Sequence, residues 1–95
     1  MIHSFADART ADLWAGKTNA RVRQVPPDVR SRAFKKLIIM DAAEEVEDLR
    51  QPPSNRLEKL KGDRVEQYSI RVNDQWRICF RWSGGVHEVE LTDYH

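Results

Sequence analysis

The sequence has very little cysteine and no long apolar run. Its single cysteine, Cys79, excludes a disulfide framework within the chain and a cluster of thiols around zinc. The longest uninterrupted apolar run is Leu37 to Met40, far shorter than the roughly 20 residues that a membrane-spanning helix needs. Met1 to Asp7 has neither the basic start nor the apolar stretch of a secretion signal. We therefore expect no membrane segment and a location in the reducing cytoplasm.

Neither sign of charge is in excess. The chain has 16 Lys and Arg against 15 Asp and Glu, a net charge of +1, which excludes a strongly basic surface overall. The charges are unevenly spread, because cations outnumber acids between Arg56 and Arg81, whereas acids gather between Asp41 and Asp48. This local cationic stretch is compatible with binding a polyanion at one place, and equally with a solvated, salt-bridged surface.

The first half of the chain carries helical signals. Asp7 as an N-cap and Gly16 as a stop predict a short helix between them. From Asp28 onward, apolar residues recur at the spacing of one helix face. Asp41 followed by Glu44 resembles a new cap. We therefore expect a long helix that is broken or kinked near Asp41.

In the second half the apolar period changes to two. Apolar and polar residues alternate over Tyr68 to Val72 and over Trp76 to Trp82, and Val86 to Leu91 supplies a third strand. Helices followed by an antiparallel meander predict an α+β fold, with N-terminal helices packed on one face of a small antiparallel β-sheet. The length of 95 residues suffices for one core, so we expect a single domain over residues 1–95.

The pairing of the strands can be predicted from turns and side-chain partners. A two-residue turn at Gly84-Gly85 sets Arg81 opposite Glu88, so that opposite charges meet, and it sets Arg77 opposite Thr92. The same ladder brings the residues after Thr92 beside Arg77.

The other hairpin brings two like charges together. A loop of Asn73-Asp74-Gln75 keeps the apolar residues paired and sets Arg71 directly across from Arg77. Like charges in this position destabilise a sheet, so the pair indicates either a bound anion or arginines that splay apart toward Glu90 or Asp74.

We expect the sheet face opposite the helices to be open and polar. Strict alternation, however, sends Asp93 and His95 to the core side, so we predict a bulge or a terminal twist that re-aims one of them. A glycine turn at Gly62 could bring two more cations to the rim of the open face. The cations and the tyrosine expected on or beside this face are Lys61, Arg64, Arg71, Arg77, Arg81 and Tyr94.

The sequence has no phosphate loop, no dinucleotide-binding glycine pattern, no metal-ligand spacing and no serine nucleophile constellation. Cleavage of RNA needs none of these, because the 2′-hydroxyl of the substrate is the nucleophile. Such an enzyme takes a proton from that hydroxyl, protonates the leaving 5′-oxygen and stabilises negative charge at phosphorus. The side chains suited to the phosphate are Lys61, Arg71 and Arg77, and those suited to proton transfer or base stacking are Asp93, Tyr94 and His95.

Three linked stretches, residues 55–64, residues 68–80 and Asp93-Tyr94-His95, together resemble the HigB branch of the RelE/ParE toxin superfamily over essentially the full length. The resemblance implies the RelE/ParE-like fold and a ribosome-dependent messenger-RNA endonuclease, the toxin of a type II toxin–antitoxin pair, which inhibits translation without metal or cofactor. The partners it implies are the 70S ribosome with its messenger RNA and a HigA-like helix-turn-helix antitoxin. DNA is then met only through the antitoxin, which represses the shared operon.

The resemblance also implies roles for single residues. Lys61 and Arg77 match family positions that handle the phosphate, and Asp93-Tyr94-His95 matches the catalytic C-terminus. Glu58 stands where some relatives have a histidine assigned to proton transfer, so that role falls to Glu58 or His95, or is weakened. Two other functions stay open: a non-catalytic ParE-like inhibitor of a protein target such as gyrase, and a plain RNA-binding module. The residues predicted to bind RNA besides the catalytic ones are Arg64, Arg71 and Arg81.

Overall fold

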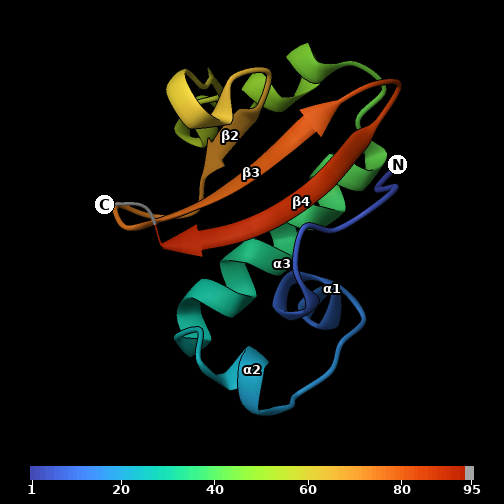
Figure 1. The fold of residues 1–95 in the computed structure, drawn as a ribbon. Helices are drawn as coiled ribbons and strands as arrows, with labels where there is room; N and C mark the ends of the chain where they lie inside the picture. The colour runs from blue at the N-terminus through green and yellow to red at the C-terminus, as the bar shows by residue number, and fades with distance from the viewer. Residues whose placement is uncertain (94–95) are drawn as a thin grey trace.

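The computed structural model describes residues 1–93, which form helices packed against an antiparallel sheet of strand order β1-β2-β3-β4. The predicted α+β class is confirmed. Helices α1, α2 and α3 lie on one side of β3 and β4 (Figure 1). The helices are α1 (Ala8–Trp14), α2 (Ala20–Arg23) and α3 (Pro27–Ala42), with 3-10 helices η1 (Val46–Arg50), η2 (Pro53–Asn55) and η3 (Gly62–Arg64). The strands are β1 (Glu58–Lys59), β2 (Tyr68–Arg71), β3 (Trp76–Trp82) and β4 (Val86–Asp93). Within the described part of the chain, no helix combines the length and apolar character needed to cross a membrane.

Side-chain caps start the first two helices. Asp7, the predicted N-cap of α1, accepts a hydrogen bond from the backbone N–H of Thr10 at 2.9 Å. Gly16, with φ of 78°, stands just beyond the end of α1 as expected. Asn19 caps α2 in the same way, because it accepts from the backbone N–H of Val22 at 3.1 Å. The sequence pattern predicts no element at α2, since four residues are too few to show a helical period.

Asp12 joins α1 to α2 and gives the fold a pH-dependent contribution. Its carboxylate accepts from Asn19 Nδ2 at 2.8 Å and from Arg21 Nη1 at 2.5 Å, and these hydrogen bonds, that of Asn19 first, lower the pKa of Asp12. A carboxyl whose pKa is lower in the folded state stabilises the fold above its unfolded-state pKa and loses that contribution as the pH falls through the folded-state value. We expect Asp12→Asn to lower the melting temperature at neutral pH, and the difference from the wild type to shrink below about pH 4.

Thermal unfolding followed by circular dichroism across the acid range checks this prediction. Asp7→Asn, which keeps the cap of α1 through an amide oxygen, is a suitable control. A deficit of Asp12→Asn that stays constant down to about pH 2 would show that the ionised carboxylate is not what matters.

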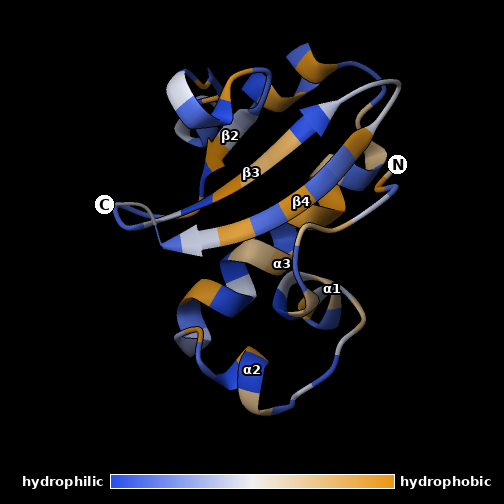
Figure 2. Ribbon diagram, in the orientation of Figure 1, coloured by the Kyte–Doolittle hydropathy of each residue, from blue (hydrophilic) through white to orange (hydrophobic). Residues whose placement is uncertain are grey.

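One face of α3 supplies the helical side of the core. Val29, Ala33, Leu37 and Met40 recur at helical spacing and are each at most 2% exposed. They pack with the apolar residues of β3 and β4, of which Phe80 is fully buried. Figure 2 shows that hydrophobic residues alternate with hydrophilic ones along β4, whereas the middle of β3 is continuously hydrophobic. These positions of the periodic stripe therefore belong to the core, whereas Phe34 and Ile38, which share its spacing, are exposed.

The predicted break of this helix is confirmed, whereas the predicted cap is wrong. α3 ends at Ala42 and the chain resumes as the 3-10 helix η1. The cap of η1 is a capping box between Glu45 and Asp48. Asp41 instead accepts a hydrogen bond from the backbone N–H of Ile2 at 2.9 Å, so its carboxylate binds the N-terminal segment.

The predicted strand register is confirmed at the end of the sheet where β2 ends and β3 begins. Arg71 pairs with Arg77 across β2 and β3, and Arg77 pairs with Thr92 across β3 and β4. Trp76 pairs with Asp93, the last described residue. The expected loop between β2 and β3 therefore has the expected length.

At the other end of β3 the predicted register is wrong by one residue. Trp82 pairs with Val86, so the turn has three residues, and Arg81 pairs with His87 instead of Glu88. A bulge in β4 absorbs the difference, and Glu88 has a φ of 50° there. The Arg81 Nε and a carboxylate oxygen of Glu88 still lie 2.5 Å apart, so the predicted ion pair forms in spite of the shifted register.

The N-terminal segment covers the outer edge of β4. Ile2 bridges to Val86 and Phe5 bridges to Val89, both in the parallel sense. Further along, the backbone N–H of Leu91 donates to Thr10 Oγ1 at 2.9 Å. The carbonyl of Leu91 accepts from Arg9 Nη2 at 3.1 Å.

Candidate active site

Arg77 is a firmly held cation on the sheet face away from the helices. Its Nε donates to Ser69 Oγ at 2.9 Å, and its Nη2 donates to the backbone carbonyl of Arg56 at 2.9 Å. The Glu58 carboxylate lies 3.9 Å from Nη2, and the Arg77 side chain is only 13% exposed. Within residues 1–93, Nη1 makes no hydrogen bond. The guanidinium is therefore fixed in place and keeps donors that suit an anion.

The carbonyl that orients Arg77 comes from a strained turn. Arg56 has the left-handed backbone conformation, with φ of 45° and ψ of 57°. The preceding residue, Asn55, is fully buried, and its Nδ2 donates to the carbonyls of Leu49 and Gln51, each at 3.1 Å. Lys36 Nζ donates to Asn55 Oδ1 from α3. Asn55 thus anchors the segment that holds the arginine of β3.

Arg71 lies directly across from Arg77, and the two side chains diverge. Arg71 Nη2 pairs with Asp74 Oδ1 in the hairpin loop, which is one of the two partners considered for a splayed arginine. The other considered partner, Glu90, accepts instead from Arg64 Nη1 at 2.9 Å. Arg71 and Arg77, the like charges of the β2–β3 hairpin, therefore each bind a different partner.

The sequence predicts that the sheet face opposite the helices is open. In the structure the centre of this face is covered. Ser69 and Cys79 lie on this face and are both fully buried. Arg64, whose segment follows β1, reaches across to Glu90, the register partner of Cys79. Burial raises the pKa of the Cys79 thiol. The alternation of apolar and polar residues correctly predicted which sheet face each side chain is on. It contained no information about the segment that covers this face.

The glycine turn separates the two cations that were expected together at the rim. Gly62, with φ of 68°, begins η3, and Arg64 at its end lies over the sheet. The side chain of Lys61 is exposed and makes no hydrogen bond or ion pair with the rest of residues 1–93. Glu58, which precedes the turn in β1, is exposed and pairs in register with Ser69.

Arg81 lies outside the cluster around Arg77. It follows Arg77 by four residues on β3, about 13 Å along the strand. Its guanidinium is bound by Glu88 at 2.5 Å and lies 3.9 Å from Glu66. Arg81, which the sequence predicts to bind RNA, therefore lies on a different part of the surface. Acidic side chains balance its charge there.

Asp93 ends the described part of β4 at the same end of the sheet as Arg77. It is exposed, and its Oδ2 accepts from Gln75 Nε2 at 3.0 Å. The register is regular from Leu91 to the pair of Asp93 with Trp76, and the bulge that β4 contains lies near the start of that strand. The predicted bulge or twist beyond Asp93 falls on residues outside those described. Tyr94 and His95, the other two predicted catalytic residues, lie outside the described residues.

Three groups near the site were not predicted from the sequence. The hydroxyl of Ser69 could have been found, because the correct register puts it diagonally beside Arg77 on the same face. Gln75 was assigned only to the hairpin loop, although it binds Asp93. The sequence contains no signal for the role of the Arg56 carbonyl, because every residue type carries a backbone carbonyl.

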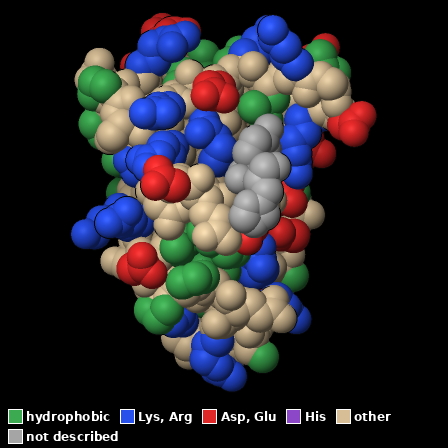
Figure 3. Space-filling view, turned by 90° about the vertical axis from the view of Figure 1, so that its left-hand side faces the viewer, with side chains coloured by type: hydrophobic (Ala, Val, Ile, Leu, Met, Phe, Trp, Pro, Cys, Tyr) green, Lys and Arg blue, Asp and Glu red, His purple; other side chains and the backbone are tan. Residues whose placement is uncertain are grey.

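Lys and Arg side chains are numerous on the side of the molecule where the described chain ends, and Asp and Glu side chains lie among them (Figure 3). At this end, a fixed guanidinium lies beside the carboxylate of Glu58 and near the end of β4. A guanidinium with unused donors binds phosphate through charge-assisted hydrogen bonds, and a neighbouring carboxylate can accept a proton. The arrangement therefore suits recognition and proton transfer at a phosphate ester.

Comparison with known proteins identifies relatives that share most of the chain. The family described as the RelE-like toxin of the type II toxin–antitoxin system HigB matches residues 3–95. The protein named Toxin HigB-1 of Vibrio cholerae is 47% identical over 75 residues, which are 79% of each chain. The protein named Endoribonuclease HigB of Proteus vulgaris is 35% identical over 72 residues, which are 75% of this chain and 77% of the relative.

A solved structure supports the same fold at lower sequence similarity. It is the YoeB–YefM complex from Staphylococcus aureus, matched with a TM-score of 0.62 and 14% identity over 100% of this chain and 98% of that chain. At this identity the likeness concerns the fold alone. The family match and the sequence relatives go further: the chain belongs to the HigB-like, RelE-type toxins of type II toxin–antitoxin systems.

Proposed function

We propose that this toxin is a ribosome-dependent messenger-RNA endonuclease that needs no metal ion for the cut. The observation that carries the proposal is the Arg77 guanidinium, fixed by Ser69 and by the carbonyl of Arg56 beside the Glu58 carboxylate. Its relative from Proteus vulgaris is named an endoribonuclease, which supports the same chemistry here. The reaction would inhibit translation in the cytoplasm, where the ribosomes are.

The proposed reaction is an attack of the substrate's 2′-hydroxyl on the neighbouring phosphorus. The O2′–P bond forms, the P–O5′ bond breaks, a base accepts the 2′ proton and an acid protonates O5′. Arg77 stabilises the charge that accumulates on the phosphate oxygens, because its position is set before the substrate arrives. The exposed Lys61 supplies a second, mobile cation. The groups that accept the 2′ proton and protonate O5′ are Glu58 and the C-terminal residues Asp93, Tyr94 and His95.

We further propose the partners that a toxin of this class requires. The antitoxin is a small helix-turn-helix protein of the HigA type, and contact with DNA occurs only through it. The family match makes the chain the toxin of a toxin–antitoxin system, and the similar fold from Staphylococcus aureus was solved as a complex of YoeB with YefM, which supports a protein partner.

Mapping the 5′ ends of cellular messages after brief induction tests the proposed activity. We expect new ends within translated regions for the complete protein, and their loss for His95→Gln, because the imidazole is a proposed proton-transfer group. Blocking translation initiation before induction should remove the new ends as well.

The outcome separates the other two functions considered. A protein that stops growth without producing new ends, and does so equally with His95→Gln, is an inhibitor of a protein target. A protein that binds messages with a strong salt dependence and leaves them intact is an RNA-binding module. Either result would replace the nuclease.

A further inference from the structure

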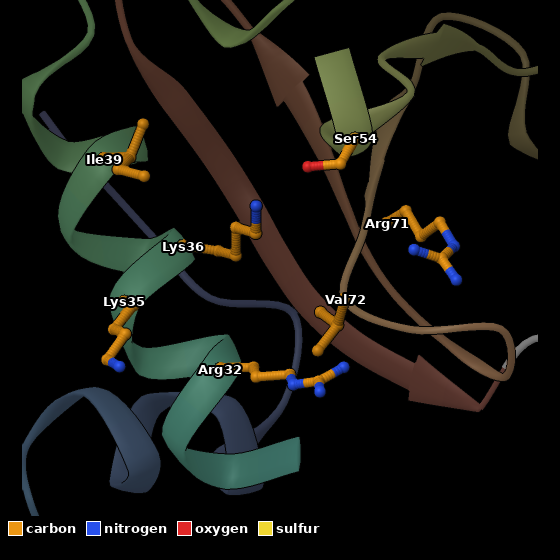
Figure 4. Close-up of a pocket in the computed structure, with 7 residues that line it drawn as sticks. All are labelled: Arg32, Lys35, Lys36, Ile39, Ser54, Arg71 and Val72. Atoms are coloured by element: carbon orange, nitrogen blue, oxygen red, sulfur yellow. The ribbon is translucent and has the colours of Figure 1, made fainter. Parts of the chain in front are cut away.

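A cavity of about 390 Å³ lies between α3 and the end of β2 (Figure 4). We call it the α3–β2 pocket. All of its charged lining residues are cationic, and two apolar side chains and one hydroxyl complete it. The lining residues are Arg32, Lys35, Lys36, Ile39, Ser54, Arg71 and Val72.

The helical part of this lining is one stripe of α3. Lys35 and Lys36 follow Arg32 by three and four residues and precede Ile39 by four and three, the spacings that put side chains on the same helix face. Cations at these spacings repel one another and weaken a helix. No acidic residue lines the cavity to offset the repulsion. The stripe therefore concentrates positive charge at one hollow of the surface.

Two of the cations are held in place by neutral or acidic partners. Lys36 is half-buried, and its Nζ donates to the amide oxygen of Asn55. Burial, and then the nearby charge of Arg71, lower the pKa of Lys36. Arg71 is paired with Asp74, whose side chain is almost entirely exposed. An anion in the cavity would gain from both cations without first having to order them.

The α3–β2 pocket is also continuous with the proposed active site. Arg71 lines the pocket and is the register partner of Arg77, and Cα atoms of such partners lie about 5 Å apart. Cations thus extend from Arg77 through Arg71 to the stripe on α3. A positively charged groove that tracks the phosphate backbone is one of the features by which proteins hold single-stranded nucleic acid.

We propose that the α3–β2 pocket binds a backbone phosphate of the RNA strand whose neighbouring phosphate is held by Arg77. This inference rests on the proposed function and assigns RNA contacts to α3, whose apolar spacing predicted only core packing. An acidic protein segment would also be attracted to the cations. The continuity with Arg77 favours RNA, because a repeating polyanion makes use of both places at once.

Binding of a short RNA analogue tests the proposal without requiring cleavage. The probe is a fluorescent 2′-O-methyl hexanucleotide, which lacks the attacking hydroxyl, and its affinity for the complete protein is measured over a series of salt concentrations. We expect the double variant Arg32→Ala with Lys35→Ala, both exposed in the wild type, to bind about tenfold more weakly. The slope of log K against log salt should flatten by about 0.7 for each phosphate that the variant no longer neutralises.

The matched control removes the same net charge from places that do not line the pocket. Arg23→Ala with Arg50→Ala changes two exposed cations, one on α2 and one on η1, and should leave affinity and slope unchanged. Equal losses in both double variants would show only a net-charge effect and would overturn the assignment. Failure of the wild type to bind the hexanucleotide at low salt would overturn it too.

A second probe separates RNA from a protein ligand. A glutamate-rich peptide of the same formal charge should bind more weakly than the hexanucleotide and should depend less on Arg32 and Lys35. The reverse order would assign the pocket to an acidic partner. This assay is independent of the nuclease: hexanucleotide binding through the pocket by a protein that cuts no messages would retain the pocket and reject the proposed function.

Discussion

Arg77→Ala should reduce cleavage of translated messages by about 100- to 1,000-fold, because it removes a preorganised donor from the phosphate. The loss should be accompanied by relief of growth inhibition. Part of the effect is specific to the guanidinium, since Nε and Nη2 are engaged by Ser69 and by the carbonyl of Arg56 while Nη1 is not. Arg77→Lys keeps the charge but cannot make these contacts together, so we expect intermediate activity.

The rate of message cleavage in a translation mixture, followed by primer extension, measures this effect. Arg50→Ala is the control, because Arg50 is exposed on η1 and pairs only locally with Glu47. The hydroxyl of Ser69 loses a buried partner in Arg77→Ala, so the rates are compared at a temperature where all variants are folded by circular dichroism. Wild-type rates in Arg77→Ala would remove this arginine from the proposed mechanism.

Asn55→Ala should destabilise the fold by about 3 kcal/mol, the largest effect on stability that we expect from a single polar residue here. The buried amide donates to the carbonyls of Leu49 and Gln51 and accepts from Lys36. Its removal leaves both carbonyls and a half-buried ammonium group without that partner, and each buried unsatisfied group costs about 1 to 3 kcal/mol. Urea unfolding of the variant and the wild type measures the difference.

Asn55→Asp tests which half of the amide matters. The carboxylate can still accept from Lys36, but it replaces the donating NH₂ with an oxygen that faces the carbonyls of Leu49 and Gln51. We expect it to be destabilised as well, in spite of the stronger attraction to Lys36. A fully stable Asn55→Asp would contradict the donor role, and a stable Asn55→Ala would contradict the anchor altogether.

The sequence permitted a good prediction of the fold where local rules control it. The cap at Asp7 and the apolar stripe of α3 are local signals, and both elements form as predicted. The pairing of Arg71 with Arg77 follows from alternation and loop length together, so it too was predictable. The turn at Gly84 was not, because a three-residue turn with a compensating bulge satisfies the same apolar pattern.

The site was less predictable, because its geometry comes from segments without periodicity. Arg77 was identified from its strand, but one of its two hydrogen-bond partners is the carbonyl of a left-handed Arg56 that no pattern marks. The burial of Cys79 results from Arg64 reaching Glu90, an interaction between residues far apart in the chain. Alternation shows which face a side chain takes, and it cannot show what lies above that face.

The N-terminal segment and α1 have a consequence for how a partner can bind. Many proteins recognise an extended peptide by adding it as a strand to a sheet edge, which requires unpaired backbone N–H and C=O groups there. On β4 those groups are bound by residues 1–6 and by the side chains of Arg9 and Thr10, as far as Leu91. Within residues 1–93, strand addition is thus confined to the two-residue edge of β1 and the last residues of β4. We therefore expect an antitoxin to contact this toxin chiefly through side chains.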